Sequence, residues 1–433
     1  MTSRWIWLLS QLTRRIWFRA SLFSLLAVAT ALLSIVASPF IPASLPARIG
    51  ADAVDNILGI IASSMLTVTT FSLSTMVSAY SAATSNVTPR ATKLVMEDST
   101  TQNVLATFVG SFLFSLVGIV ALSTGAYGDR GRLVLFLVTI AIIVLIVVTL
   151  LRWIDHLSRL GRVTETTERV EQVTLEAMRS RSQLPYLGGK PLLDEERDVP
   201  STARAVFVSA FGYVQHVDTG ALSKIAADCE GVIYLRAVPG SFVDPTEPIA
   251  WIDGIAGEDQ DTEICACFSI ADTRSFDQDP RFGACVLAEI ASRALSPAVN
   301  DPGTAIDVIT RGIRILAVWN EPRDKDAEII FPNIHVPPID LADLFDDIFT
   351  PIARDGAGLI EVVLRLQKAL RTLSRLEDPR YAFNASRHAR ESLERSERAL
   401  TTDSDKRRVR AVAESFAMAG SPIPINSAAP AAI

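Results

Sequence analysis

The sequence has few residues that could carry catalytic or metal chemistry. Its 433 residues include only four cysteines and four histidines, and the histidines are too scattered to form a ligand set. A Walker-type phosphate loop, a nucleophile elbow and a zinc-protease helix are all absent. We therefore expect no enzyme activity, no cofactor, no bound metal and no catalytic residue. The cysteines all lie in the second half of the chain, where we expect them to be reduced.

Positive charge is also in deficit, with 41 Lys and Arg residues against 48 Asp and Glu residues and a net charge of −7. This balance gives no support for nucleic-acid binding, which requires a basic surface. Hydrophobic residues make up 49% of the chain. A chain of this length has room for a membrane domain and at least one soluble domain.

The stretch from Asn56 to Pro89 contains no Asp, Glu, Lys, Arg or His. It is long enough to cross a bilayer, since about 20 apolar residues suffice for a helix to do so. Hydroxyl residues recur within it at steps of three or four, so a helix places them in one stripe. We call this set the hydroxyl stripe: Ser64, Thr67, Thr70, Ser74, Ser78, Ser81 and Ser85. We expect this stripe to face something other than lipid.

Two interpretations of the hydroxyl stripe are open. In the first, small side chains let neighbouring helices pack closely, as membrane bundles routinely do. In the second, several copies of this helix surround a water-lined path, and the hydroxyls replace part of the hydration of an ion or small solute. The sequence alone does not separate the two.

The fold class predicted from these patterns is an α-helical membrane domain with four transmembrane helices, followed by a cytoplasmic α+β domain and C-terminal helices. The predicted parts are a four-span membrane domain at 1–155 with spans at about 20–38, 54–80, 104–124 and 133–151, a helical extension and linker at 156–200, an α+β domain at 201–320, a helical region at 321–419 and a disordered tail at 420–433. In the α+β domain we expect an acidic turn at 257–261 and a strand at 263–270. Residues 321–338 read as a loop.

The distribution of Lys and Arg predicts the orientation. The N-terminal segment, the connection containing Arg90 and Lys93, and the region after the last span with Arg152 and Arg159 are all positively charged. Such loops stay on the cytoplasmic side. The sequence therefore predicts a protein of the bacterial inner membrane with both termini in the cytoplasm.

The densest polar set in the second half is a candidate pocket or interface. It comprises Gln278, Asp279, Arg281, Arg293, Asn300 and Asp301. A guanidinium such as Arg293 could pair with a carboxylate or an anionic ligand. Alternatively, Asp279 and Asp301 cap helices that begin at the following prolines, which we favour because capping alone explains the Asp-Pro pairs.

Several motifs resemble the domain-of-unknown-function 2254 family of predicted bacterial membrane proteins. They are RSFDQDPRFG at 274–283, RALSPAVNDP at 293–302 with Thr304, the GAD beginning at Gly50, the hydroxyl-rich second span, TPR at 88–90 and GYVQHVD at 212–218. The resemblance covers most of the chain from Gly50 to Trp319. It implies a multi-pass membrane protein with a cytoplasmic C-terminal half and no established activity.

Two function classes follow. The favoured one is a homo-oligomeric channel or pore for ions or small solutes, with the hydroxyl stripe along the path and the cytoplasmic half assembling or gating it. The other is a membrane-anchored sensor or scaffold whose cytoplasmic domain binds a ligand or partner. Apart from Asp55 in the first turn of the second span, the predicted spans contain no Asp, Glu, Lys, Arg or His, which weighs against a proton-coupled transporter.

Overall fold

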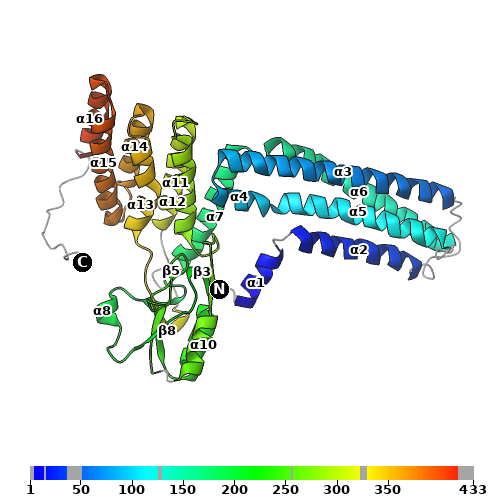
Figure 1. The fold of residues 1–433 in the computed structure, drawn as a ribbon, viewed down its shortest axis with the longest axis horizontal. Helices are drawn as coiled ribbons and strands as arrows, with labels where there is room; N and C mark the ends of the chain where they lie inside the picture. The colour runs from blue at the N-terminus through cyan, green and yellow to red at the C-terminus, as the bar shows by residue number, and fades with distance from the viewer. Residues whose placement is uncertain are drawn as a thin grey trace. The chain divides into compact units, whose positions relative to one another are not determined.

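The computed structural model describes residues 4–13, 16–36, 51–124, 129–254, 257–321 and 329–417. These residues divide into two compact units, the N-terminal unit Trp5–Thr166 and the C-terminal unit that begins at Thr167. Figure 1 shows long helices in the first and a mixture of helices and strands in the second. The predicted tail at 420–433 lies outside the described residues.

The N-terminal unit is built from helices. They are α1 (Arg4–Thr13), α2 (Ile16–Val36), α3 (Ala51–Asn86), α4 (Pro89–Met96), α5 (Ser99–Ser123) and α6 (Asp129–Arg159). Three described stretches are long and apolar enough to cross a membrane, namely Ala53–Ala82, Ser99–Ser123 and Gly131–Arg159. These confirm three of the four predicted spans. The span predicted at 20–38 falls on α2, whose apolar stretch Trp17–Thr30 is shorter, so the fourth span stays a prediction.

Helix α5 lies at the centre of this unit, because α2, α3 and α6 all pack against it. Two glycines allow the close approach. A Cβ atom at Gly110 would lie 3.3 Å from the carbonyl oxygen of Phe23 on α2, and one at Gly118 would lie 3.0 Å from Leu58 on α3. The small residues that permit close helix packing in this unit therefore include glycines of α5.

The predicted helical extension does not continue the last span without a break. Helix α6 ends at Arg159, and α7 (Val163–Gln183) begins only after Gly161, whose φ of 81° lies in the left-handed region. An α-helix cannot pass through that conformation, and glycine adopts it at no steric cost. The hydrophobic period of this stretch predicted helix correctly but gave no sign of the break.

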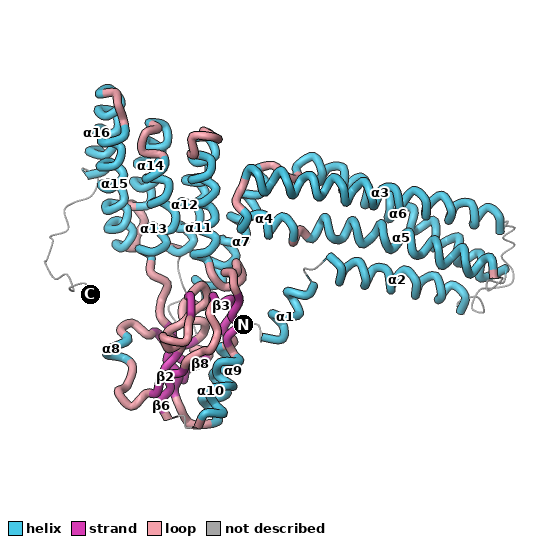
Figure 2. The backbone as a smooth tube through the Cα atoms, in the orientation of Figure 1, coloured by secondary structure: helices cyan, strands magenta, loops and turns pink. Residues whose placement is uncertain are grey.

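The C-terminal unit contains two sheets (Figure 2). The larger has the strand order β1-β8-β4-β6-β2, formed by Gly189–Pro191, Phe331–Val336, Val232–Leu235, Ala250–Asp253 and Arg204–Val206. The smaller has the order β5-β3-β7, formed by Phe242–Val243, Gly212–Val217 and Phe268–Ala271. Strand β8 pairs in parallel with both β1 and β4. The helix α9 (Thr219–Asp228) packs against β4 and β8.

Two local predictions in this unit are wrong. The segment 321–338 was expected to be a loop, but it contributes β8, a central strand of the larger sheet. Residues 258–266 form the helix α10 (Glu258–Ala266) in place of an acidic turn and the start of a strand, and only Phe268–Ala271 is extended. A strand that pairs with segments more than 100 residues away leaves little local signal.

The remaining helices form a layer in the C-terminal unit. Besides the short α8 (Glu195–Asp198), they are α11 (Pro280–Ala294), α12 (Pro302–Trp319), α13 (Leu341–Asp355), α14 (Ile360–Leu373), α15 (Pro379–Ala399) and α16 (Asp403–Ala417). Helix α11 packs on α12 and α13, α12 on α14, and α15 on α13, α14 and α16. Both the larger sheet, which continues into β8, and this helical layer therefore extend across the predicted division at residue 320.

Helix α7 is fixed to this layer by buried charges. Arg311 Nη1 lies 2.5 Å from Glu171 Oε2, and Arg314 Nη2 donates to the same oxygen at 2.8 Å. The side chains of Glu171 and Arg311 are both buried. Burial alone would raise the pKa of Glu171, but the hydrogen bonds and charges of Arg314 and Arg311 outweigh it and lower this pKa. The carboxylate is thus ionised at neutral pH and holds α7 against α12.

A glycine provides the second contact of α7. A Cβ atom at Gly283 on α11 would lie 1.9 Å from Thr174 Oγ1 and 2.8 Å from Thr174 Cβ. The Gly283→Ala substitution should therefore force α7 and α11 apart and lower the free energy of unfolding by about 1–3 kcal/mol. Urea unfolding of the full-length protein in detergent would measure the change.

The matched control for this substitution is Gly358→Ala, where the nearest atom to a new Cβ is the Ala399 carbonyl oxygen at 4.0 Å. That change should move the free energy of unfolding by less than about 0.5 kcal/mol. Equal effects of the two substitutions would contradict the tight α7–α11 contact.

Candidate functional site

The hydroxyl stripe lies on the outward face of α3. The side chains of Ser64, Thr67, Thr70, Ser74, Ser78 and Ser81 are all exposed in the single chain, and Ser85 belongs to the same helix, although its side chain is outside the described residues. Successive helix residues are about 100° apart. Met65, Ser72 and Met76, each two positions before a stripe residue, are buried and therefore point to nearly the opposite side.

Three of the stripe's hydroxyl groups donate their hydrogens within the helix. Thr67 Oγ1 donates to the Ser63 carbonyl at 3.0 Å, Thr70 Oγ1 to Leu66 at 2.9 Å and Ser78 Oγ to Ser74 at 3.0 Å. Each of these hydroxyl oxygens can still accept hydrogen bonds through its lone pairs. The face that these residues present is therefore rich in acceptors and carries no formal charge.

The outward face of α6 has a different character. Its most exposed side chains include Leu137, Val144, Val147, Leu151 and Ile154. Such a surface matches the acyl chains of lipid and needs no protein partner. Helix α3 thus exposes the hydroxyl stripe together with apolar side chains such as Ile60 and Phe71, whereas the exposed side chains named on α6 are all apolar.

The structure divides the polar set of the second half between the two ends of α11. Asp279 caps its start by accepting from the Phe282 amide at 3.1 Å, and Gln278 Oε1 accepts from the Val217 amide at 3.2 Å. Asp301 caps the start of α12 through Thr304, at 3.1 Å from its amide nitrogen and 2.6 Å from its hydroxyl. The two capped helix starts are thus separated by the length of α11, about 20 Å.

The other members of the set stay with one end or the other. Arg281 lies in the first turn of α11, Arg293 in its last turn, and Asn300 precedes the second cap with a left-handed φ of 49°. The six residues therefore do not form one pocket. The Asp-Pro pairs have the capping role that the sequence suggested.

Asp279 also belongs to a buried charge cluster. Arg274 pairs with it through two hydrogen bonds of 2.7 and 3.0 Å. Burial raises the pKa of Asp279, although Arg274 opposes this shift. The buried Arg181 of α7 lies near this carboxylate, and burial lowers its pKa to about 10. The sequence gave no indication of Arg181, because it lies about 100 residues before Asp279.

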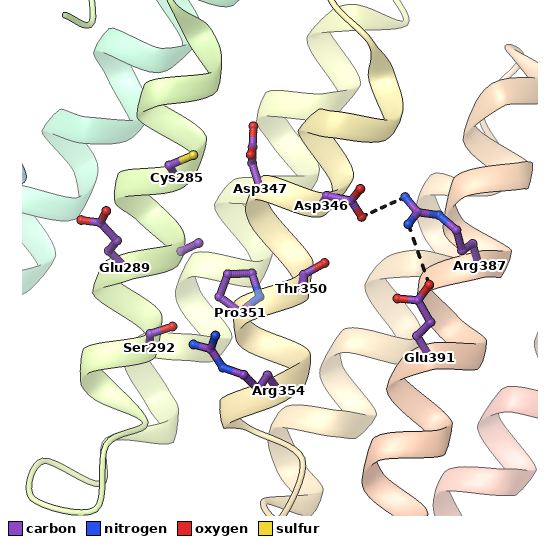
Figure 3. A pocket seen from close by; sticks show the side chains of 11 residues that line it. Cys285, Glu289, Ser292, Asp346, Asp347, Thr350, Pro351, Arg354, Arg387 and Glu391 are labelled. Atoms are coloured by element: carbon purple, nitrogen blue, oxygen red, sulfur yellow. Dashed lines mark ion pairs between the residues drawn. The ribbon is translucent and has the colours of Figure 1, made fainter. Parts of the chain in front are cut away.

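Arg281 connects the first turn of α11 to a groove that sequence reasoning missed. Its Nε donates to Asp347 Oδ2 at 2.7 Å, and Asp347 lines a groove of about 720 Å³ between α11, α13 and α15 (Figure 3). Cys285, Glu289 and Ser292 come from α11, Asp346 to Arg354 from α13, and Arg387 and Glu391 from α15. The helical spacing of these residues was visible in the sequence, but their convergence depends on tertiary packing.

The groove is crossed by ion pairs. Arg387 lies 2.9 Å from Asp346 and 3.8 Å from Glu391, and the buried His388 is 3.0 Å from Asp346. Burial lowers the pKa of His388, and the charge of Arg387 lowers it further. Both signs of charge therefore line the groove. Within the described residues no group of three His, Cys, Asp or Glu side chains is placed to hold a metal ion.

Cys285 is the one thiol in the groove wall. Burial raises its pKa to about 12, and the nearby Asp347 adds to the shift. At pH 8 its thiolate fraction should be on the order of one in ten thousand, and the thiolate is the reactive form. A variant that keeps Cys285 and has Ser at the other three cysteine positions should therefore react with iodoacetamide about a thousand times more slowly than an ordinary thiol. Alkylation followed by mass spectrometry would measure the rate.

The same variant unfolded in urea provides the control, because its thiol then regains an ordinary pKa. Asp347→Asn should speed alkylation of the folded protein. A folded rate equal to the unfolded rate would contradict the shift.

The comparison with known proteins agrees with the membrane character of the N-terminal unit. A family model described as "Predicted membrane protein (DUF2254)" matches residues 13–372. Uncharacterized proteins of Mycobacterium bovis and Mycobacterium tuberculosis are each 30% identical over 145 residues, which is 30% of this chain and 28% of the relative. The match thus spans less than a third of these relatives, and no solved structure matches. The chain belongs to the DUF2254 family of predicted membrane proteins.

Proposed function

We propose that this protein is a homo-oligomeric, channel-like protein of the bacterial inner membrane, with the hydroxyl stripe of α3 along the path. The observation that carries the proposal is the exposure of six stripe residues on the face of α3 opposite its buried side. Packing within the chain does not account for them, because the close contacts run through α5. A second copy of the chain, or water between copies, is the remaining surrounding that suits a polar face in a bilayer.

The chemistry of the stripe favours water and cations over anions. The hydroxyl hydrogens of Thr67, Thr70 and Ser78 are donated to carbonyls of their own helix. Oxygen lone pairs are what replaces the hydration shell of a cation in selective pores. The stretch Asn56–Pro89 has no Lys, Arg or His that would attract an anion. The permeant species proposed is therefore a cation or a small neutral solute.

The C-terminal unit serves assembly or gating in this proposal, and it has no enzymatic role. Both termini are placed in the cytoplasm because Arg90, Lys93, Arg152 and Arg159 flank the same ends of the spans. The partners are the lipid bilayer and further copies of the same chain, with no nucleic acid.

The hydroxyl stripe makes the proposal testable by flux. Purified full-length protein in liposomes should conduct monovalent cations. Ser74→Leu and Ser78→Leu should each reduce the flux at least tenfold while leaving the oligomer intact, since a bulky apolar side chain narrows and dewets a polar path. Cation-sensitive dyes in the vesicles and chemical cross-linking of the protein would measure flux and assembly.

Two sets of controls match these substitutions. Ser74→Ala and Ser78→Ala keep the path wide, and Val144→Leu adds bulk to the exposed apolar face of α6. All three should conduct as the parent does. Undiminished flux in both leucine variants would show that the stripe does not line a path.

A second candidate function is a membrane-anchored sensor or scaffold. The groove between α11, α13 and α15 supports it, since about 720 Å³ lined by both signs of charge is large enough for a small polar ligand. Absence of flux for several ions and under applied tension would favour this function over the channel.

A further inference from the structure

A buried polar cluster joins three helices of the N-terminal unit. His156 on α6 has its Nε2 2.8 Å from Asp98 Oδ2, at the start of α5, and 3.1 Å from Thr101 Oγ1. The ring of Trp153, one turn earlier on α6, stacks on the imidazole at 5.6 Å. Trp153 Nε1 donates to Ser72 Oγ of α3 at 2.9 Å. The cluster therefore links α5, α6 and the buried face of α3.

The hydrogen bonds of this cluster fix the state of its members. Asp98 accepts from the Thr101 amide at 2.9 Å and from the Thr101 hydroxyl at 2.6 Å, which suits an ionised carboxylate. Because the Thr101 hydrogen is already donated to Asp98, His156 Nε2 must carry a hydrogen to face both oxygens. The other ring nitrogen, Nδ1, is then the atom that gains or loses a proton, and the side chain is 15% exposed.

We infer that this Asp98–His156–Trp153–Ser72 cluster is a proton-responsive latch that controls how firmly α3 is held. When a proton from solvent adds to Nδ1 of His156, the side chain becomes a cationic imidazolium. The hydrogen bond from Nε2 to the ionised Asp98 then becomes a salt bridge between opposite charges, and the imidazolium gains attraction to the Trp153 ring. Acidification therefore tightens the connection from α5 through α6 to Ser72.

Asp98 is a charged group in direct contact with the His156 ring. Further charged side chains on the neighbouring helices include Arg19 on α2, Arg90 and Lys93 on α4, Glu97 after it, and Arg152, Asp155 and Arg159 on α6. Arg19 bonds to Asn103 at 2.9 Å, and Asp155 pairs with Arg159 in an exposed position. Neither α5 nor the part of α3 from Asn56 to Asn86 contains a charged residue.

This latch acts on the helix that carries the proposed path, so its regulatory meaning rests on the proposed function. Ser72 lies two positions before Ser74, on the opposite side of α3. A firmer hold on Ser72 fixes the rotation and position of the stripe. The proton response of the Asp98–His156–Trp153–Ser72 cluster does not depend on whether the protein conducts ions.

Trp153 provides a direct measurement, because a protonated imidazole quenches an indole stacked against it. A variant that keeps Trp153 and has Phe at the other five tryptophan positions, reconstituted at full length, should lose fluorescence as pH falls from about 8 to about 5. His156→Gln in this background should abolish the loss, since the amide still donates to Asp98 but gains no charge. A pH-independent emission, or an equal loss in the glutamine variant, would overturn the inference.

Should the tryptophan replacements impair folding, histidine labelled with ¹³C in the otherwise unchanged protein gives the same titration by NMR. The His156→Gln variant assigns the signal among the four histidines. Failure of this signal to titrate between about pH 5 and 8 would also overturn the latch.

The link to α3 is tested by amide hydrogen exchange of the segment around Ser72, corrected for the intrinsic effect of pH. Exchange should be slower at acidic pH in the parent, and this difference should vanish in His156→Gln and Ser72→Ala. Equal protection at both pH values would overturn the control of α3. Loss of flux in Ser74→Leu addresses the channel separately, so either proposal can fail alone.

Discussion

Hydrocarbon offers no hydrogen-bond partner to a polar side chain, and this constraint accounts for where the N-terminal unit places its polar residues. Thr107 and Ser111 of α5 return their hydroxyl hydrogens to the preceding turn, at 2.8 Å each. Ser72 of α3 instead accepts from Trp153. Thr67, Thr70 and Ser78 of the stripe combine a hydroxyl hydrogen donated within the helix with an exposed side chain. Such hydroxyl groups can face lipid, but their oxygens can also accept hydrogen bonds where water or another copy of the chain faces them.

The C-terminal unit depends on contacts that are distant in sequence. Strand β8 follows α11 and α12 in the chain and pairs with β1 and β4, so the sheet is completed by a segment that lies beyond two helices of the layer. Helix α7 is held by Glu171 with Arg311 and Arg314. A buried pair of this kind leaves an uncompensated charge when one partner is lost. The same contacts that complete the fold therefore fix the helix that follows the spans.

Sequence patterns predicted the elements that are determined by neighbouring residues in the chain. Long uncharged runs predicted three spans, and the Asp-Pro pairs at Asp279 and Asp301 predicted two helix starts. The predictions failed where pairing or packing decides the structure, as for β8, and where one residue changes direction, as at Gly161. The groove and the Asp98–His156 pair were missed for a similar reason. Asp98 precedes one predicted span and His156 follows another, so a search for charges within the spans did not find them.

The two sides of α3 relate the candidate functions to each other. One side bears Ser72, which joins a cluster containing an ionisable pair, and the other bears the stripe. Ser72 and the stripe belong to one helix, so any rotation of α3 at Ser72 turns the stripe with it. Under the two proposals made above, one molecule would respond to protons through His156 and form a path along α3. The choice between sensor and channel becomes a question of what the outward face of α3 meets.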